Sequence, residues 1–164
     1  MKILICTAIL AAAVMAADAN AEFTGSVGST YAEVSGADLF VANATLGYKF
    51  PVNEHISIQP EIRGGVGLNE DSVSGVDVEI NNTFGFNLRL QAEISNSIYV
   101  FAQPSYTRYE VEAEGFGFEF SDKSWEFGGG GGLGFRLNQN FALEAGYERV
   151  DDLDTWRAAF RFYY

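Results

Sequence analysis

The sequence predicts an all-β protein, an eight-stranded antiparallel up-and-down transmembrane β-barrel. Hydrophobic residues make up 48% of the 164-residue chain and aromatic residues 15%, yet after the N-terminal segment there is no apolar run of about 18 residues. Apolar residues instead alternate with polar ones, as in strands that separate two unlike environments. Because backbone groups in lipid must pair with one another, a membrane protein without long apolar runs has to be a closed barrel.

The N-terminus is typical of a secretory signal peptide over 1–21, followed by one domain over 22–164. Lys2 supplies a positive charge, an apolar stretch follows it, and Ala19-Asn20-Ala21 matches the small-x-small cleavage pattern. Ala17-Asp18-Ala19 is a second candidate cut. The only cysteine, Cys6, lies in this segment, so we expect no disulfide and no thiolate chemistry in the mature chain.

The alternation of apolar and polar residues predicts where the strands lie. From Ile56 to Asn69, apolar residues hold the even positions and mostly polar residues or glycine the odd ones. The same split recurs over 79–92, with Ile80 on the apolar parity, and again over 124–136 and 156–164. Each predicted strand is close to the roughly 9–11 residues that a tilted strand needs to cross a bilayer. The predicted strands are 23–33, 39–50, 56–69, 78–92, 97–109, 123–137, 141–150 and 155–164.

The connections between these strands differ in character. Asn53, Asn96 and Asn140 mark three short connections, spaced 43 and 44 residues apart, which form a weak internal repeat. The other connections are polar and acidic, and two of them are long; they span 34–38, 70–77, 110–122 and 151–154. Short turns on one side and longer loops on the other are typical of transmembrane barrels. We therefore expect the short turns in the periplasm and the acidic loops outside the cell.

The C-terminal segment carries the most specific resemblance to a known family. Alternating apolar residues lead to a terminal aromatic residue, at Trp156, Phe160, Phe162 and Tyr164. Together with the alternation, this segment resembles the small outer-membrane barrels of the OmpA/OmpX type, including the opacity-protein-like porin group, over all of 22–164. The resemblance implies a Gram-negative outer membrane and a signal read by the barrel-assembly machinery. No peptidoglycan-binding domain follows, so we do not expect a cell-wall anchor.

Alternation by itself leaves two arrangements open. A soluble lipocalin-like barrel would turn the apolar parity inward around a ligand, whereas a membrane barrel turns it toward lipid. Most of the phenylalanines fall on the apolar parity, with tyrosines and tryptophans toward the strand ends, where aromatic girdles of membrane barrels lie. We therefore expect the apolar parity outside and the polar parity inside.

The polar parity carries charges of both signs. Buried charges are tolerable only when paired, so the near balance of signs predicts an interior network. Its predicted members are Lys49, Glu61, Arg63, Arg89, Glu126, Arg136, Glu144, Glu148, Arg157 and Arg161. An eight-stranded interior is just wide enough for side chains. We interpret the network as a structural plug rather than an ion or proton pathway, with a small porin-like diffusion channel as the alternative.

Glycines crowd the predicted sixth strand. The spacing Gly129-x-Gly131-x-x-Gly134 matches a dinucleotide-binding loop, but that loop requires a helix to follow, and here a strand continues. No cofactor is therefore predicted. We expect the inward-facing glycines of this strand to leave room for Tyr99 and Phe101 on its neighbour.

Nothing in the sequence predicts catalysis or a metal site. His55, the only histidine, falls in a predicted periplasmic turn. Membrane-embedded enzymes that modify lipid typically use a histidine near the outer leaflet, so a lipid-modifying enzyme is a disfavoured alternative. The main prediction is an integral outer-membrane barrel with a structural or surface-interaction role and no catalysis.

The net charge of the chain limits which partners it can bind. The net charge is −12, and it stays −12 without residues 1–21, because one base and one acid leave together. A chain this acidic is a poor candidate for binding nucleic acid. The acidic loops make Ca²⁺ or Mg²⁺ candidate partners, although no EF-hand spacing is present.

Three bases fall on the apolar parity near the predicted outer strand ends: Arg108, Lys123 and Arg149. We expect them to form one cluster on neighbouring strands. Arginine and lysine both suit phosphate groups, so the cluster predicts a contact with lipid A of lipopolysaccharide in the outer-membrane lipid.

Overall fold

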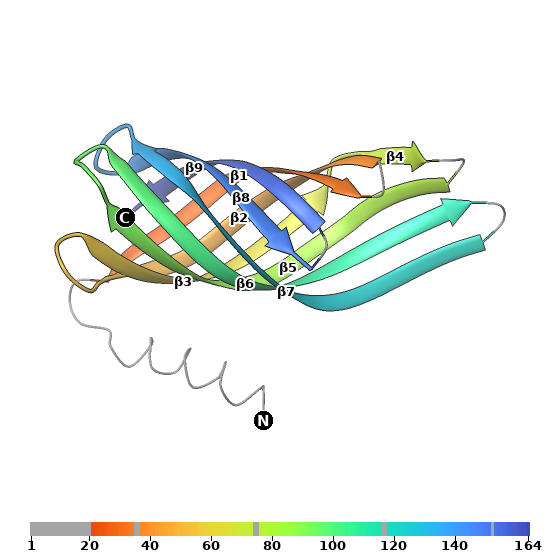
Figure 1. Cartoon of the computed structure of the whole chain (residues 1–164), viewed down its shortest axis with the longest axis horizontal. Helices are drawn as coiled ribbons and strands as arrows, with labels where there is room; N and C mark the ends of the chain where they lie inside the picture. Colours follow the sequence, from red (N-terminus) through yellow and green to blue (C-terminus); the bar gives the residue numbers. More distant parts are fainter. Residues whose placement is uncertain (1–20, 35–36, 74–75, 116–117, 152) are drawn as a thin grey trace, which may run out of the picture.

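Antiparallel pairing closes the strands of this computed structural model into a barrel (Figure 1). The structure describes residues 21–34, 37–73, 76–115, 118–151 and 153–164, so the predicted signal peptide, apart from Ala21, lies outside the described residues. The strands are β1 (Glu22–Val34), β2 (Ala37–Pro51), β3 (Ile56–Gly67), β4 (Glu70–Val73), β5 (Val76–Glu93), β6 (Ile98–Gly115), β7 (Phe118–Arg136), β8 (Phe141–Val150) and β9 (Leu153–Tyr163).

The nine strands occupy eight positions around the barrel, because β4 follows β3 after two residues and pairs with the same neighbour, β5. The sheet order is β3-β2-β1-β9-β8-β7-β6-β5-β4, and the β3–β5 pairing closes the ring. Phe23 and Tyr164 exchange backbone hydrogen bonds of 2.9 and 2.8 Å where the first and last strands meet. The predicted eight-stranded up-and-down barrel is confirmed. In the described part of the chain, no helix is both long enough and apolar enough to span a membrane.

The apolar parity faces outward and the polar parity inward. Ile62 is 47% exposed, whereas its neighbour Arg63 is 7% exposed. The same contrast runs along β8, where Leu143 is exposed and Glu144 is buried. This pattern confirms the membrane arrangement of the two parities over the lipocalin-like one.

Ile80 departs from the predicted parity. The register of β5 shifts between Ile80 and Asn82. An irregularity of this kind reverses which residues of a strand face the interior. Ile80 is therefore buried, in contact with Ala37, Leu39 and Val41, and its predicted place on the outer face is wrong.

Three turns of one design join strands at one end of the barrel. A side-chain oxygen of Asn53, Ser95 or Asn138 accepts hydrogen bonds from the backbone N–H groups two and three residues later, at 2.8 to 3.3 Å. These turns carry the internal repeat that the sequence indicates. The accepting side chains of the second and third turns are Ser95 and Asn138, and Asn96 and Asn140 lie within these turns, as predicted.

The strands continue through the segments predicted as outer loops. Strand pairing reaches Val34 with Ala37, Val73 with Val76, Gly115 with Phe118, and Val150 with Leu153, so two residues separate the strands at each tip. The prediction of long loops over 70–77 and 110–122 is wrong. The acidic residues in these segments alternate with valine, alanine and phenylalanine, which satisfies the period of a strand. Acidic composition indicated exposure to water, not the absence of a strand.

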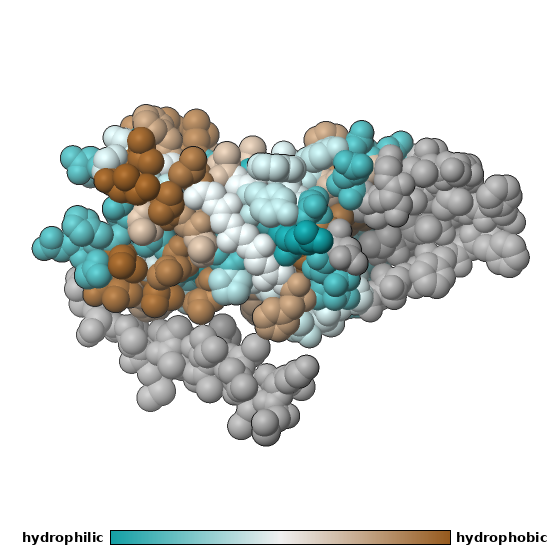
Figure 2. All heavy atoms as spheres, in the orientation of Figure 1, coloured by the Kyte–Doolittle hydropathy of each residue, from teal (hydrophilic) through white to brown (hydrophobic). Residues whose placement is uncertain are grey.

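The outer surface of the barrel is not uniform. Aliphatic surface gathers at the end with the three turns, at the left of Figure 2, and Val52, Ile94 and Leu137 are more than half exposed there. Nearer the other end, four aromatic residues lie in direct register across neighbouring strands: Tyr147, Trp156, Tyr31 and Phe40. A row of this kind is what an aromatic girdle at a membrane–water interface requires.

Candidate functional site in the barrel interior

Glu144 on β8 is the centre of the interior charges. Its Oε1 accepts hydrogen bonds from Arg89 Nη2 at 2.5 Å, from Arg161 Nε at 2.8 Å and from the Tyr99 hydroxyl at 2.7 Å. Arg157 Nη2 lies 3.7 Å from Oε2. All of these side chains are buried. One carboxylate therefore balances part of the charge of three guanidinium groups, which in a low-dielectric interior holds them together.

A second carboxylate extends the network across the barrel. Arg161 Nη1 donates to Glu61 Oε1 at 2.6 Å and is 3.5 Å from Gln59 Oε1. Gln59 in turn donates to Gln91 at 3.0 Å. Arg161 thus links Glu144 on β8 to Glu61 on β3, on the opposite wall. The network ties together strands that share no backbone hydrogen bonds.

Two aromatic rings pack against the guanidinium group of Arg89. Its guanidinium carbon lies 3.7 Å from the centre of the Phe101 ring and 5.8 Å from that of Tyr99. A Cβ atom at Gly134 would lie 2.0 Å from the Tyr99 ring, and one at Gly132 would lie 2.7 Å from the Phe101 ring. The prediction that inward glycines make room for these two rings is therefore confirmed.

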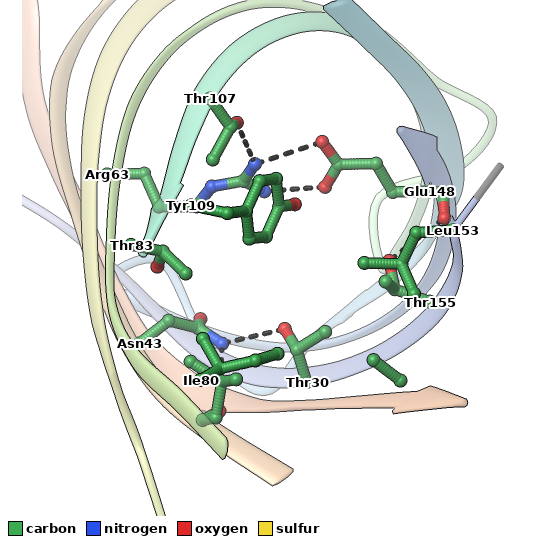
Figure 3. A pocket seen from close by; sticks show the side chains of 12 residues that line it. Thr30, Asn43, Arg63, Ile80, Thr83, Thr107, Tyr109, Glu148, Leu153 and Thr155 are labelled. Atoms are coloured by element: carbon green, nitrogen blue, oxygen red, sulfur yellow. Dashed lines mark hydrogen bonds and ion pairs between the residues drawn. The ribbon is translucent and has the colours of Figure 1, made fainter. Parts of the chain in front are cut away.

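A separate ion pair lies toward the outer end. Arg63 and Glu148 form a two-pronged pair, with Nη1–Oε2 at 2.5 Å and Nη2–Oε1 at 3.0 Å, and Arg63 also donates to Thr107 at 2.7 Å (Figure 3). Ser105 donates to the same carboxylate at 2.5 Å. Paired donors and acceptors of this geometry are the strong class of charged hydrogen bond.

A small cavity adjoins this pair. It measures about 30 Å³, room for roughly one or two water molecules. Hydroxyl and amide side chains line much of it, including Thr30, Asn43, Thr83 and Thr155 (Figure 3). Val41 and Ile80, which also line the cavity, belong to a buried apolar cluster with Ala37 and Leu39.

The end with the three turns is open. A recess of about 1050 Å³ lies there, lined by the turns together with Lys49, Glu93 and Arg136. Arg136 forms an ion pair with Glu93 and lies 5.1 Å from the centre of the Tyr163 ring. Lys49 Nζ is 3.4 Å from Glu22 Oε2. The lumen is therefore accessible from the turn end and filled further in.

The predicted network residues separate into two buried clusters, two residues at the recess and Glu126. The structure joins Arg89, Glu144, Arg157, Arg161 and Glu61 in one cluster and Arg63 with Glu148 in another. Lys49 and Arg136 lie at the recess, and Glu126 is half-buried opposite Thr107.

Two acids that complete these pairs, Glu22 and Glu93, lie outside the predicted network. Glu93 directly follows residue 92, where the predicted strand 78–92 ends, and it has the same inward parity as Arg89 and Gln91. Extending that parity by one residue would have found it.

The arrangement offers little chemistry. Its carboxylates are engaged with arginines. The Tyr99 and Ser105 hydroxyls donate to carboxylates, and the Thr107 hydroxyl accepts from Arg63. His55 is exposed in a turn at the recess. Among the residues that the structure describes, no three histidine, cysteine or acidic side chains are grouped to hold a metal ion.

The three bases on the outer parity do not form one cluster. Arg108 pairs with Trp125, and Lys123 with Glu110, so these two bases are diagonal neighbours. Arg149 pairs with Gly129, six residues along β7 from Lys123, a separation of about 20 Å. The expected cluster assumes that neighbouring strands end at one level, but β7 runs far beyond the end of β8. Arg149 instead lies 3.8 Å from Asp154.

Comparison with known proteins gives one matching family and several solved structures of similar fold. The model of the outer membrane protein beta-barrel domain family matches residues 3–162. Ail of Yersinia pestis, solved with the heparin analogue sucrose octasulfate, is 18% identical with a TM-score of 0.61, over 87% of this chain and 97% of that one. The N-terminal barrel of Pseudomonas aeruginosa OprF is 10% identical with a TM-score of 0.61, over 88% and 98%.

Neisserial surface protein A is 12% identical with a TM-score of 0.58, over 87% of this chain and 95% of that one. At these identities the likeness shows a shared fold. A search among functionally curated proteins finds no match.

Proposed function

The chain belongs to the outer membrane protein β-barrel domain family, and from this premise we propose that it is a surface-interaction protein whose barrel interior is a structural plug. The proposal rests above all on the contrast between a filled lumen and a sheet that extends beyond the barrel rim. A diffusion channel would need an open lumen, whereas a surface protein needs a displayed surface.

Two layers support the plug. The Glu144 cluster spans the lumen with side chains that are almost fully buried. The apolar contacts around Ile80 and Leu39 lie toward the outer end. An ion crossing both layers would have to separate buried ion pairs and then enter apolar surroundings, each at a cost of several kcal/mol.

The displayed surface is the sheet formed by β4, β5, β6 and β7. The β8–β9 hairpin stops at Val150 and Leu153, and β8 reaches no further along β7 than Gly128. The β6–β7 pairing continues beyond that point to Gly115 and Phe118. This sheet projects beyond the other hairpins at the right of Figure 1, and we call it the projecting sheet.

Planar-bilayer recording with the refolded chain tests the plug. We expect no reproducible porin-sized conductance steps. Such steps would favour the small diffusion channel instead.

Adhesion of whole cells tests the surface role. Cells displaying the chain are compared with cells displaying a variant in which residues 111–122 are replaced by Asn-Gly, on immobilised purified proteins of graded net charge. We expect the shortened variant to lose binding while its barrel remains folded. Equal binding by both would count against a surface role.

Orientation and processing belong to the same proposal. We propose that residues 1–21 are removed as a signal peptide and that the projecting sheet faces out of the cell. A cysteine at Gly115 should react with an impermeant thiol reagent on intact cells, and one at Asn140 should not. N-terminal sequencing of the membrane-inserted protein should begin at Glu22.

The C-terminal strand suits the assembly role that its sequence indicates. Trp156 and Tyr164 are exposed on the outer face, on the same parity as Phe160 and Phe162. We propose that this face is the segment read by the barrel-assembly machinery. Deleting Tyr164 should slow assembly of the barrel in the membrane and should change the stability of the assembled barrel little.

We propose a contact with lipid A at Arg108 and Lys123, with Arg149 as a separate point. Arg108 pairs with Phe84 and Trp125, at the aromatic level where lipid headgroups lie. The net charge of −12 opposes phosphate binding, so divalent cations would have to bridge the acidic surface to it. Glutamine variants of Arg108 and Lys123 should lose any stabilisation by lipopolysaccharide, whereas a variant of Arg149 alone should lose less.

We propose no catalytic role. His55 lies at the opposite end of the barrel from the projecting sheet, which leaves the lipid-modifying enzyme as the disfavoured alternative.

A further inference from the structure

We propose that the barrel interior binds one monatomic anion of the chloride class, held by the guanidinium group of Arg157. The proposal goes beyond the surface role and does not depend on it, but it rests on the interior being a plug. Three observations carry it: an excess of buried positive charge, buried N–H groups without partners, and a polar layer between the two clusters of ion pairs.

The buried charges of the interior do not balance. Among the described residues, the buried charged side chains are the arginines Arg63, Arg89, Arg157 and Arg161 and the glutamates Glu61, Glu144 and Glu148. Each glutamate has one close arginine, at 2.5 or 2.6 Å between nitrogen and oxygen. Arg157 lies 3.7 Å from Glu144, which two other arginines contact at shorter distances. One buried positive charge therefore has no acid of its own.

Acids elsewhere in the barrel do not supply the missing negative charge. Glu22 and Glu93, at the end with the three turns, each have a base of their own. Glu126 on β7 is distant. Arg157 is in register with Gly146, and Gly146 with Gly132 on β7. Gly132 is six residues from Glu126, about 20 Å along the strand.

Arg157 has hydrogen-bond donors to spare. Its Nη2 donates to Ser26 Oγ at 3.1 Å. Its Nε and Nη1 are buried and have no hydrogen-bond partner among the described residues, and the same holds for Arg161 Nη2 and Asn87 Nδ2. Buried donors are nearly always paired in folded proteins, and an unpaired donor on a charged group is the most costly kind. These groups therefore indicate an acceptor that the chain itself does not provide.

Asn87 and Arg157 lie between the two clusters, and we call them the middle layer. Asn87 is in register with Glu61 of the Glu144 cluster and with Ser105, which contacts the outer ion pair. Arg157 contacts the Glu144 cluster and is in register with Thr30, which lines the cavity beside the outer pair (Figure 3). Their strands, β5 and β9, are four places apart around the eight-position ring. Donors thus face the middle layer from opposite walls.

The charge and the available room define the class of ligand. Water would accept from these N–H groups but would leave the buried positive charge unbalanced, whereas an anion does both. A cation is excluded by the same charge. The cavity that adjoins the layer measures about 30 Å³, which suits an occupant close to water in size. Chloride meets this limit, and a carboxylate or phosphate does not.

The rival to a bound anion is a contact within the chain. Glu61 Oε2 is buried without a hydrogen-bond partner, and an Arg157 side chain that turned toward it would gain an acceptor. Glu61 already pairs with Arg161 at 2.6 Å, however. Such a turn would still leave four buried arginines on three glutamates.

The test compares anions that differ in size at equal ionic strength. The full chain is refolded into phosphatidylcholine vesicles in sodium chloride, sodium bromide or sodium gluconate, whose anion is too large for the layer, and its unfolding in urea is measured. Crystals grown in bromide locate the ion by anomalous scattering. Arg157→Gln removes the charge from the middle layer. Lys49→Gln removes one positive charge from the open end of the lumen and is the matched control.

We expect the unfolding equilibrium constant of the wild type and of Lys49→Gln to be at least roughly tenfold smaller in chloride or bromide than in gluconate. An ion that binds only the folded barrel stabilises it by mass action. Arg157→Gln should unfold alike in all three salts. One bromide should lie within hydrogen-bonding distance of Arg157 in the wild type and in Lys49→Gln. The wild-type comparison decides the matter even where a variant does not fold.

Equal unfolding of the wild type in halide and gluconate would overturn the proposal. So would a bromide-grown crystal in which water fills the middle layer or Arg157 bonds to Glu61 Oε2. Bromide found at the recess or the outer surface alone would be an adventitious ion only, and would overturn it as well.

Planar-bilayer recording separates this inference from the plug on which it rests. Porin-sized conductance with bromide bound at Arg157 would overturn the plug and leave the anion site standing. A non-conducting barrel without a halide in its interior would leave the plug standing and overturn this inference.

Discussion

The barrel interior and the projecting sheet treat charge in opposite ways. In the interior, Glu144 and Glu61 are each engaged by arginine, and Arg63 is matched by Glu148. In the projecting sheet, Glu112 pairs in register with Glu79, so two acidic residues lie directly opposite each other on neighbouring strands. The same chain therefore satisfies its charges in one region and leaves them opposed in the other.

The difference follows from the surroundings. Inside the barrel an unpaired charge loses its hydration and costs several kcal/mol, so each acid needs a base. Beyond the membrane, water and salt screen neighbouring carboxylates, and their repulsion is small. Interior charge is thus constrained by stability, whereas charge on the projecting sheet is constrained far less. The comparison predicts that equal changes in the two regions have very different effects.

Removing the central interior carboxylate should have the largest effect. Glu144→Ala leaves Arg89, Arg161 and Arg157 without their shared acid and should lower the free energy of unfolding by about 3–5 kcal/mol. Urea unfolding in lipid vesicles measures this loss. Glu119→Ala, on the projecting sheet, is the control and should stay within about 0.5 kcal/mol of the wild type. Similar losses for both would erase the contrast between the regions.

Moving an arginine by one residue sharpens the same point. Arg63 is tolerated inside because Glu148 pairs with it, whereas Ile62 is exposed on the lipid-facing surface. Ile62→Arg should therefore cost about 2–4 kcal/mol at the bilayer midplane. Ile62→Val should cost far less in the same unfolding assay. A harmless Ile62→Arg would mean that this face does not meet lipid.

The glycines of β7 offer a matched pair within one strand. A Cβ at Gly134 would lie 2.0 Å from the Tyr99 ring, but at Gly129 the nearest atom would be 3.9 Å away. Gly134→Ala should displace Tyr99 from Glu144 and cost about 1–3 kcal/mol. Gly129→Ala should change the unfolding free energy by less than about 0.5 kcal/mol. The reverse order would show that the Tyr99 ring is not held against this strand.

The smallest expected effect is a gain in the stability of the projecting sheet. Replacing Glu112, Glu114 and Glu119 together by glutamine removes like-charge pairs and should stabilise the projecting sheet by less than about 1 kcal/mol. Hydrogen exchange of the β6–β7 hairpin at low salt measures it. The gain should vanish at high salt, because screening already removes the repulsion in the wild type. A gain that persists there would have a cause other than charge.

Much of the interior could be predicted because a strand gives each residue one of two faces. Arg63 and Arg89 fall on the polar parity, and a lumen without free water forces acids to be near them. The partners themselves could not be predicted. Arg161 reaches Glu61 from 100 positions away in the chain, and only the closed barrel brings β9 and β3, which do not pair with each other, around one lumen.

The projecting sheet shows the converse. The alternation of its strands is present in the sequence. The acidic composition of 70–77 and 110–122 nevertheless predicts loops, whereas these segments pair as β4–β5 and β6–β7. The length of β7 that extends beyond β8 has no signal in the sequence, since it depends on how far β8 runs before it turns.

The sequence by itself determined the alternation, hence the two faces, the closed barrel and the kinds of side chain inside it, because period and polarity are local properties of a strand. The tertiary structure decided which acid meets which arginine, where Ile80 turns inward, and why Arg149 stands apart from Lys123. Those outcomes depend on the register between strands, and register is set by the relative lengths of neighbours and by one irregularity in β5. A one-residue change in register moves every facing pair, so contacts across the barrel are fixed only when all strands are in place.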